Sequence, residues 1–250
     1  MMENSKDTNH KNPFGKLLEA RRRIRKIARN EEGAVNIEEQ VWRIYGSGLR
    51  DYNESFYQTL DALDLRSFEG YVEERQRRGK KTFVLDVMAE GTFLRQLPGI
   101  DGGLAVTLVD KRAEKSKALD QSKNIDVIAG DILSPKTWRQ ISQWMQDRDI
   151  SSFDLIVCRG VGALLDIPQE LYSHILTEVW GRLSKDGGVL VTQFPPKAEE
   201  LARKLQHQLS LSGVRAIIQR EKSGIQYDSA SYPAIAVIKT DQAPEQWNFG

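Results

Sequence analysis

The stretch FVLDVMAEGTFL, residues 83–94, decides the fold class of this chain. An apolar run closes with an acid, Asp86, and a short loop then leads into a helical pattern that contains Phe93 and Leu94. Four more apolar runs without polar alternation follow, separated by stretches with helical spacing. Strands that are buried on both faces have this pattern, so the sequence predicts an α/β fold with a doubly wound, mostly parallel sheet and right-handed crossovers.

The end of the chain has a different pattern from its middle. The runs 214–219 and 232–239 have only the turn-rich SGIQYDSAS between them, which predicts an antiparallel hairpin. Together with the five earlier runs, this hairpin gives a seven-stranded sheet. The five earlier strands are expected at residues 82–87, 104–109, 125–129, 153–158 and 188–194.

The sequence before residue 80 has only helical patterns, so it predicts helices and no strands. Ser67 precedes an amphipathic pattern that ends in a basic turn and a glycine, Gly79. Two shorter helices are expected before it, with Asn36 and Asp51 as caps and a break at residues 46–48. The expected organisation is a disordered tail, a helical N-terminal cap, the sheet domain and a second tail, at residues 1–13, 14–79, 80–240 and 241–250.

Composition and charge exclude several classes of protein. The 250 residues include one cysteine, Cys158, so no internal disulfide can form, and 36 basic residues balance 35 acidic ones. Such a balance provides no general field that would attract nucleic acid or an anionic membrane. The sequence shows no secretory signal, no apolar run of about 18 residues and no histidine grouping typical of a metal site. We therefore expect a cytoplasmic protein without membrane contact or a bound metal.

Acids at the carboxyl ends of the expected strands are the candidate binding residues, because ligands of open parallel sheets bind beyond these ends. Asp110 follows Asp86 by 24 residues, where an acid can accept both hydroxyls of an adenosine ribose. Asp131 ends the third run and could accept from the adenine amino group, while Ile132 offers the ring an apolar face. Each acid could instead be a polar strand end, but together they predict a nucleoside-shaped site.

A nicotinamide-dependent dehydrogenase is disfavoured by the same loop. The pattern G-x-G-x-x-G is absent, and Glu90 at the start of the expected helix would repel a pyrophosphate. An acid at this place is compatible with the ammonium group of a ligand that carries an amino acid. The loop therefore favours such a ligand over a dinucleotide.

With these features, residues 80–240 resemble the class I S-adenosylmethionine (SAM)-dependent methyltransferases, whose Rossmann-like seven-stranded sheet ends in an antiparallel hairpin. The resemblance rests on VLDVMAEGTFL, LVD, AGDIL, FDLIVCRG and GRLSKDGGVLVTQF, in chain order. It implies SAM as the cofactor, with the loop from Met88 to Gly91 against its methionine part. The residues that it implies at the cofactor are Asp86, Met88, Ala89, Glu90, Gly91, Asp110, Lys111, Asp131, Ile132 and Arg159.

The first motif departs from the family pattern. The family usually has three alternating glycines after the acid, and this chain has Met88, Glu90 and Thr92 there, with Gly91 as the glycine present. Glycine lets backbone approach a ligand and accepts positive φ, so side chains at these positions narrow the pocket or move the loop. A diverged loop could bind the cofactor through altered contacts or could have lost it.

The substrate side of the site is expected after the fourth run and before the N-terminal helices. The resemblance places Arg159 and Gly160 toward the substrate, and Tyr45 with Arg50 and Tyr52 could form a lid over the cofactor. Core packing of the tyrosines and an ion pair between Arg159 and a neighbouring acid are the alternatives.

The methyl acceptor cannot be identified from the sequence. The fourth motif lacks the Asn/Asp-Pro-Pro-Tyr-like turn of enzymes that methylate amino groups of nucleic acids, and a small molecule is favoured over RNA or protein. The segment Lys16–Arg29 has seven basic residues and one acid, so it could bind RNA, although its apolar residues favour docking on the main domain. The rival hypothesis is a non-catalytic binding protein that keeps the fold and uses this segment for RNA or a protein partner.

Overall fold

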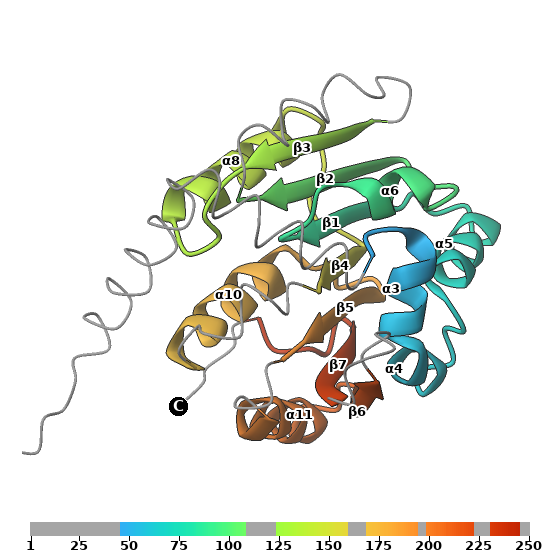
Figure 1. The fold of residues 1–250 in the computed structure, drawn as a ribbon, viewed down its shortest axis with the longest axis vertical. Coiled ribbons are helices and arrows are strands. Elements are labelled where there is room, and N and C mark those ends of the chain that lie inside the picture. The colour runs from blue at the N-terminus through green and yellow to red at the C-terminus, as the bar shows by residue number, and fades with distance from the viewer. Residues whose placement is uncertain (1–45, 109–123, 160–168, 195–198, 223–230, 246–250) are drawn as a thin grey trace, which may run out of the picture.

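A seven-stranded sheet organises the part of the chain that the computed structural model describes, which is residues 46–108, 124–159, 169–194, 199–222 and 231–245 (Figure 1). The strand order is β3-β2-β1-β4-β5-β7-β6. Strands β1 to β5 pair in parallel, and β7 is antiparallel to both β5 and β6. The strands are β1 (Phe83–Val87), β2 (Gly102–Thr107), β3 (Ile125–Ala129), β4 (Leu155–Cys158), β5 (Gly188–Gln193), β6 (Ala216–Lys222) and β7 (Ser231–Lys239). This topology confirms the predicted doubly wound sheet with its terminal antiparallel hairpin.

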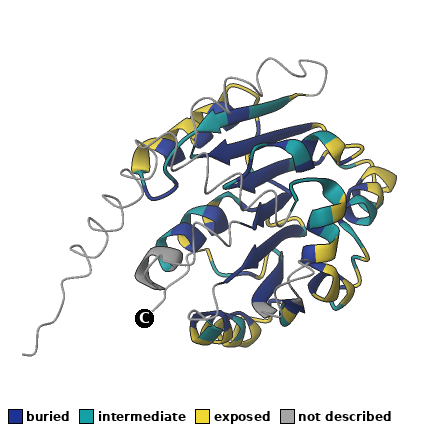
Figure 2. Ribbon diagram, viewed as in Figure 1, coloured by how far each residue is buried: buried dark blue, intermediate teal, exposed yellow. Residues whose placement is uncertain are grey.

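Helices cover both faces of the sheet, and each face has its own apolar cluster. One cluster joins Val84 and Val157 to α3, α4, α5 and α6, and the other joins Leu85 and Ile156 to α8, α10 and α11. Alternate residues of each strand therefore contact opposite layers, and the strands are buried on both sides (Figure 2). The helices are α3 (Leu49–Ser55), α4 (Tyr57–Asp61), α5 (Phe68–Arg77), α6 (Thr92–Gln96), α8 (Pro135–Gln146), α10 (Gln169–Arg182) and α11 (Glu199–Leu211).

Among the element boundaries that differ from the sequence prediction, those of α3 and β2 have identifiable reasons. Asp51 is the third residue of α3 and not its N-cap, because Gly48 is the capping residue and donates its backbone N–H to Asp51 Oδ2 at 2.9 Å. Strand β2 starts at Gly102, two residues before the predicted Leu104. Glycines are weak strand formers, but a Cβ on Gly103 would lie 3.1 Å from Leu94 Cδ1, so glycine allows α6 to pack closely on this strand.

The first residues of the expected C-terminal tail pack against the sheet domain. Ala243 is buried, and the indole Nε1 of Trp180 donates a hydrogen bond of 2.8 Å to the Pro244 carbonyl. The sequence pattern missed this contact because residues 241–245 are polar apart from this short Ala-Pro pair. The chain therefore stays on the domain as far as residue 245.

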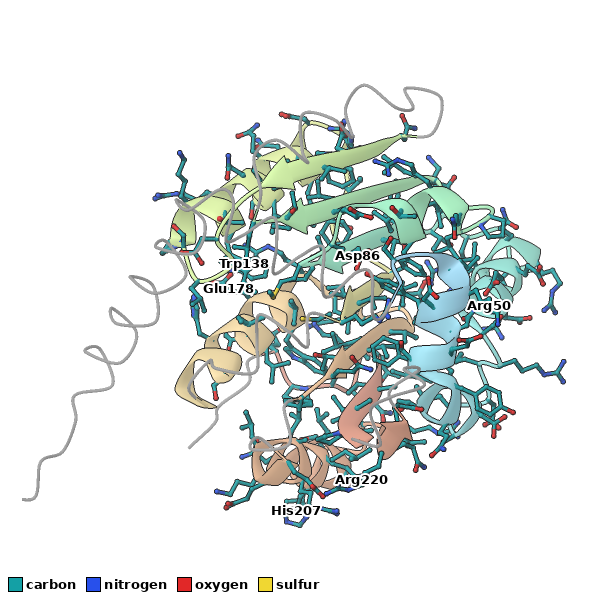
Figure 3. The ribbon with its side chains drawn as sticks, viewed as in Figure 1. Arg50, Asp86, Trp138, Glu178, His207 and Arg220 are labelled. Atoms are coloured by element: carbon teal, nitrogen blue, oxygen red, sulfur yellow. The ribbon has the colours of Figure 1, made fainter. Side chains whose placement is uncertain are left out.

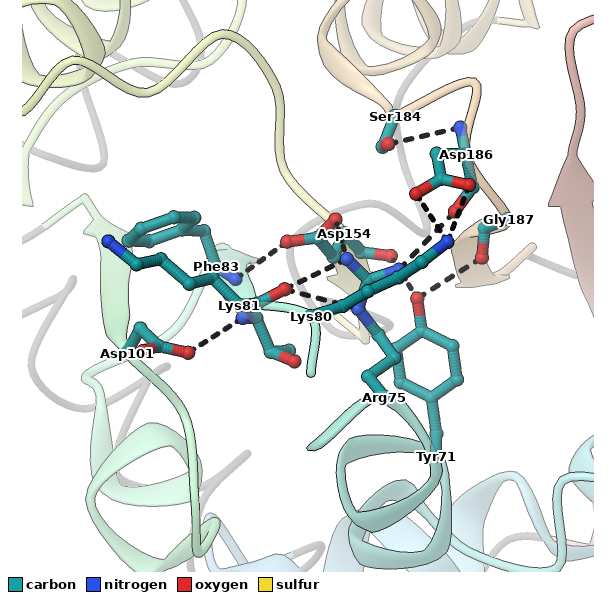
Figure 4. A network of polar contacts seen from close by, with 11 residues as sticks. Tyr71, Arg75, Lys80, Lys81, Phe83, Asp101, Asp154, Ser184, Asp186 and Gly187 are labelled. Atoms are coloured by element: carbon teal, nitrogen blue, oxygen red, sulfur yellow. Dashed lines mark hydrogen bonds and ion pairs between the residues drawn. The ribbon is translucent and has the colours of Figure 1, made fainter. Parts of the chain in front are cut away.

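A buried ion pair fixes α5 to the amino-terminal edge of the sheet (Figure 4). Arg75 Nη2 lies 2.5 Å from Asp154 Oδ1, and both side chains are about one-tenth exposed. The second oxygen of Asp154 accepts the backbone N–H of Phe83 at 2.9 Å, and Arg75 also donates to the Lys81 carbonyl. Tyr71 donates its hydroxyl to the Asp154 carbonyl at 2.8 Å. The network joins α5 to the beginnings of β1 and β4.

Replacing Arg75 by Met should destabilise the protein strongly, because the Asp154 carboxylate would stay buried without its charge partner. We expect a loss of about 3–5 kcal/mol in the free energy of unfolding, measured by urea denaturation. Arg77→Met is the matched control, since Arg77 lies on the same helix but pairs with Glu74 at an exposed site, and it should change stability by less than about 0.5 kcal/mol. Similar losses in the two variants would contradict this account.

Lys239 is a buried cation beneath the end of α10. Its Nζ donates to the carbonyls of Trp180 and Leu183 at 2.6 and 3.0 Å and lies 4.7 Å from the centre of the Trp180 ring. A positive charge is stabilised by the carbonyl groups at the C-terminal end of a helix. Burial nevertheless lowers the pKa of Lys239 to about 8, and the nearby Lys185 acts in the same direction.

This lowered pKa makes stability depend on pH in a defined window. Between about pH 8 and the ordinary lysine pKa of 10.5, the folded protein binds fewer protons at Lys239 than the unfolded chain does. The free energy of unfolding should therefore rise with pH in this window relative to a Lys239→Met variant. Urea denaturation from pH 7 to 10.5 measures the difference, with the exposed Lys204→Met as control. A wild-type advantage that is constant across this range would disprove the assignment.

Candidate functional site

The carboxyl ends of β1 and β4 meet at the point where the strand order reverses. β1 lies between β2 and β4, and Val87 is in register with Cys158. The chain therefore leaves these two neighbouring strands at Met88 and at Arg159. Ligands of doubly wound sheets bind in the crevice outside such a switch point.

Asp86 holds a fully buried carboxylate just inside this edge (Figure 3). The hydroxyl of Tyr52 lies 3.1 and 3.2 Å from its two oxygens. Burial raises the pKa of Asp86 well above its usual value, against the opposing effects of the Tyr52 hydrogen bond and the Arg159 charge. A carboxylate has about four acceptor positions, and among the described residues Tyr52 supplies the one side-chain donor. Asp86 therefore keeps acceptor positions that the described side chains do not use.

The loop after β1 follows a backbone path that glycine favours, although only one of its residues is glycine. Met88 has φ 64° and Gly91 has φ 83°, both in the left-handed region. A Cβ on Gly91 would lie 3.0 Å from Val127 Cγ2, so this position needs glycine for space as well. Ala89 is fixed by its backbone N–H, which donates to the Val106 carbonyl at 2.8 Å. The methionine at position 88 therefore occupies a strained conformation and does not block this loop geometry.

Glu90 links the loop to the segment before α3. Its Oε1 accepts hydrogen bonds from the hydroxyls of Ser47 at 2.9 Å and Thr92 at 3.0 Å. The neighbouring Leu49 donates its backbone N–H to Gln96 Oε1 at 2.8 Å. The start of α3 is thus tied to the loop and to α6.

Arg159 reaches back from the end of β4 to the same segment. It is buried, its Nη1 donates to the Gly46 carbonyl at 2.9 Å, and its guanidinium carbon lies 4.7 Å from the centre of the Tyr52 ring. The Tyr52 ring also stacks on Phe93 with 4.2 Å between centroids. Arg159 therefore provides a positive charge between the end of β4 and the first residues of α3.

Asp131 and Ile132 lie at the end of β3 on the same edge of the sheet. Gly130 donates its N–H to the Thr107 carbonyl at 2.8 Å, which aligns the ends of β3 and β2. Asp131 is half-buried, and its Oδ1 accepts the backbone N–H of Leu133 at 2.9 Å within its own turn. Ile132 belongs to the core cluster beneath α8 and is 2% exposed. Their contact with adenine stays a prediction.

The structure brings one group of predicted residues together, and another group lies outside the described residues. Asp86, the loop from Met88 to Gly91 and Arg159 meet at the switch point. The predicted residues and the basic segment that fall outside the described ranges are Tyr45, Asp110, Lys111, Gly160 and Lys16–Arg29.

Arg50, which the sequence predicts on the substrate side, has an exposed side chain, and its contact with a substrate stays a prediction. Its side chain is 88% exposed and pairs with Glu54 one helical turn away, at 2.8 Å (Figure 3). The reason is the orientation of α3, whose inward residues are Tyr52 and Ser55. Position 50 therefore faces solvent.

The contacts of Tyr52 and Gln96 were not predictable from the sequence. The sequence left a lid and core packing as the alternatives for Tyr52, and the structure shows it packed in the core with its hydroxyl on Asp86. Tyr52 and Asp86 are 34 positions apart in the chain. No local spacing rule connects them, because the docking angle of α3 decides the contact.

The described residues contain neither a metal-binding cluster nor a membrane-spanning helix. Within them, no group of three or more His, Cys, Asp or Glu side chains could hold a metal ion. No helix among them is long and apolar enough to cross a membrane.

Comparisons with known proteins find distantly similar solved structures and no family match. No family model matches the chain, and no curated protein matches it. Similar solved structures include magnesium protoporphyrin IX methyltransferase ChlM from Synechocystis PCC 6803 with bound SAM, at TM-score 0.49 and 14% identity over 81% of this chain and 90% of that one. The N-methyltransferase NodS from Bradyrhizobium japonicum WM9 has TM-score 0.43 and 15% identity over 69% of this chain and 94% of that one.

These values are too low to transfer a ligand or an acceptor. The strand order with its antiparallel β7 is the basis for assigning the class I methyltransferase fold to this chain. A fold hosts many functions, so the function must be argued from the site.

The left-handed conformation of Met88 predicts an unusual order of stability among variants. In an ordinary strand or helix, Gly is less stable than Ala by about 0.5–1 kcal/mol. At position 88, with φ 64°, Met88→Gly should be more stable than Met88→Ala, by about 1 kcal/mol. The two variants lose nearly the same side-chain packing, so urea denaturation of the pair isolates the backbone effect. An alanine variant as stable as the glycine variant would show that the loop adopts another path.

Proposed function

We propose that this chain binds SAM at the switch point between β1 and β4 and transfers its methyl group to an acceptor of small-molecule size. The observation that carries the proposal is the buried Asp86 carboxylate, which has one side-chain donor among the described residues and unused acceptor positions. Burial still raises the pKa of Asp86 despite the Tyr52 hydrogen bond and the Arg159 charge, so the ionised form favours a ligand that brings a further donor and positive charge.

The described residues fit the methionine part of SAM. Its ammonium group would lie against Asp86, and the loop from Met88 to Gly91 would offer backbone groups beside it. Asp110 on the ribose, Lys111 beside it, and Asp131 with Ile132 at adenine complete the proposal for the nucleoside. Those assignments are supported by the alignment of the β1, β2 and β3 ends through the Ala89 and Gly130 hydrogen bonds.

The chain itself has a limited chemical task in such a reaction. SAM supplies an electrophilic methyl group when it is bound, so the protein mainly orients the acceptor and excludes water. Arg159, with Gly160 next to it, is the proposed substrate-side group, because it lies at the switch point and carries a positive charge. No dedicated base is obligatory for this role.

A small-molecule acceptor is supported by the charge balance of the chain. With 36 basic and 35 acidic residues, there is no overall positive charge of the kind that drives binding to RNA. The basic segment Lys16–Arg29 keeps RNA as an alternative acceptor or partner.

Calorimetric titration with S-adenosylhomocysteine tests the proposed binding. We expect micromolar affinity in the wild type, loss of binding in Asp110→Ala, and affinity weakened at least about tenfold in Asp86→Asn, because the variant removes the charge that would meet the ammonium group. Asp61→Asn is the matched control, since Asp61 is exposed on α4.

The same titration decides between the enzyme and the non-catalytic rival. The rival is favoured by the side chains of Met88 and Glu90, which stand where the family usually has glycine. Folded wild-type protein that gives no heat with S-adenosylhomocysteine would overturn the proposal and leave a binding protein with this fold. Heat of binding in a titration with a reduced nicotinamide cofactor would instead indicate an oxidoreductase.

A further inference from the structure

The short segment from Gly46 to Tyr52 crosses the switch point and contacts each part of it. The Gly46 carbonyl accepts from Arg159 after β4, and Ser47 donates to Glu90 in the loop after β1. Tyr52 completes the series by donating to Asp86 within β1. These partners lie between 34 and 113 positions away in the chain, so the contacts form only when α3 is docked.

Tyr52 is held so that its hydroxyl has one direction available. The residue is 1% exposed, its ring stacks on Phe93 at an interplanar angle of 6°, and the Arg159 guanidinium lies over the ring. The ring cannot turn away without breaking the stack. The hydroxyl therefore stays at nearly equal distances, 3.1 and 3.2 Å, from the two Asp86 oxygens.

We propose that Tyr52 is a positioning residue for the cofactor: its hydroxyl holds the Asp86 carboxylate in the orientation that receives the ammonium group, and it thereby couples the docking of α3 to cofactor binding. This inference rests on the proposed function. It adds a residue from outside the sheet domain to the site, and it gives α3 a role in ligand affinity as well as in packing.

The charges around Asp86 determine how removal of this hydroxyl would act. Arg159 favours the ionised carboxylate, Glu90 opposes it, and Tyr52 favours it through the hydrogen bond. The thiol of Cys158 also lies within electrostatic range of Tyr52. Without the hydroxyl, the pKa of Asp86 rises further. As the pH is lowered, the carboxylate of the variant therefore loses the charge that binds an ammonium group at a higher pH than the carboxylate of the wild type does.

The test is a Tyr52→Phe variant, which keeps the ring stack and removes one oxygen atom. We expect its affinity for S-adenosylhomocysteine at pH 7 to fall by about tenfold, as for the loss of one hydrogen bond to a charged group. The decline in affinity on the acid side should also move to higher pH than in the wild type. Calorimetry between pH 5 and 8 would follow both effects, because burial raises the pKa of Asp86 above its ordinary value and the loss of the hydroxyl raises it further.

Tyr57→Phe is the matched control, because Tyr57 lies on the next helix and is 62% exposed. It should bind as the wild type does at every pH. Hydrogen exchange of the wild type provides a second measurement that needs no variant: S-adenosylhomocysteine should slow the exchange of the α3 amides. Unchanged α3 exchange in the bound protein would overturn the coupling.

The outcomes separate this inference from the proposed function. If the wild type does not bind S-adenosylhomocysteine, both are wrong. If the wild type binds and Tyr52→Phe binds equally well, the function stands and the role of Tyr52 is wrong. A loss of affinity in Tyr52→Phe that is the same at every pH would indicate a structural effect and would also overturn the inference.

Discussion

The burial of the Asp86 carboxylate at the switch point is the constraint on which the arrangement of the site depends. A carboxylate removed from water must find donors or a positive charge, or it becomes protonated. Here the Tyr52 hydroxyl comes from α3 and the Arg159 charge comes from the end of β4. Tyr52 and Arg159 lie in separate parts of the chain, so the sheet and the N-terminal helices have to assemble together before these two groups can oppose the effect of burial on the pKa of Asp86.

Two buried aspartates at opposite edges of the sheet show how this fold separates stability from binding. Asp154, before β4, has Arg75 on one oxygen and a backbone N–H on the other, and so it joins the sheet to α5. Asp86, inside β1, shares one hydroxyl between its two oxygens. The amino-terminal edge is therefore internally satisfied, whereas the carboxyl-terminal edge keeps acceptor capacity for a ligand, as expected for a doubly wound sheet.

The sequence predicted the sheet well because its signals are local. The apolar runs and the Ser67 cap each lie within or next to the element that they define, and the structure confirms them. The site was predictable only in part. The strand-end position of Asp86 follows from its run, but the Tyr52 contact depends on how α3 docks. The outward direction of Arg50 was not predictable either, because a seven-residue helix has little periodicity to determine which residues face the core. The left-handed conformation of Met88 was not predictable, since such backbone is uncommon for residues other than glycine.

The most direct test is a crystal structure of the protein with S-adenosylhomocysteine. The account predicts that the ligand lies outside the ends of β1 and β4, with its ammonium nitrogen within hydrogen-bonding distance of the Asp86 carboxylate and Tyr52 still in contact with that carboxylate. Density for the ligand at another place, or Met88 and Glu90 side chains filling this position in a protein that takes up no ligand, would contradict it.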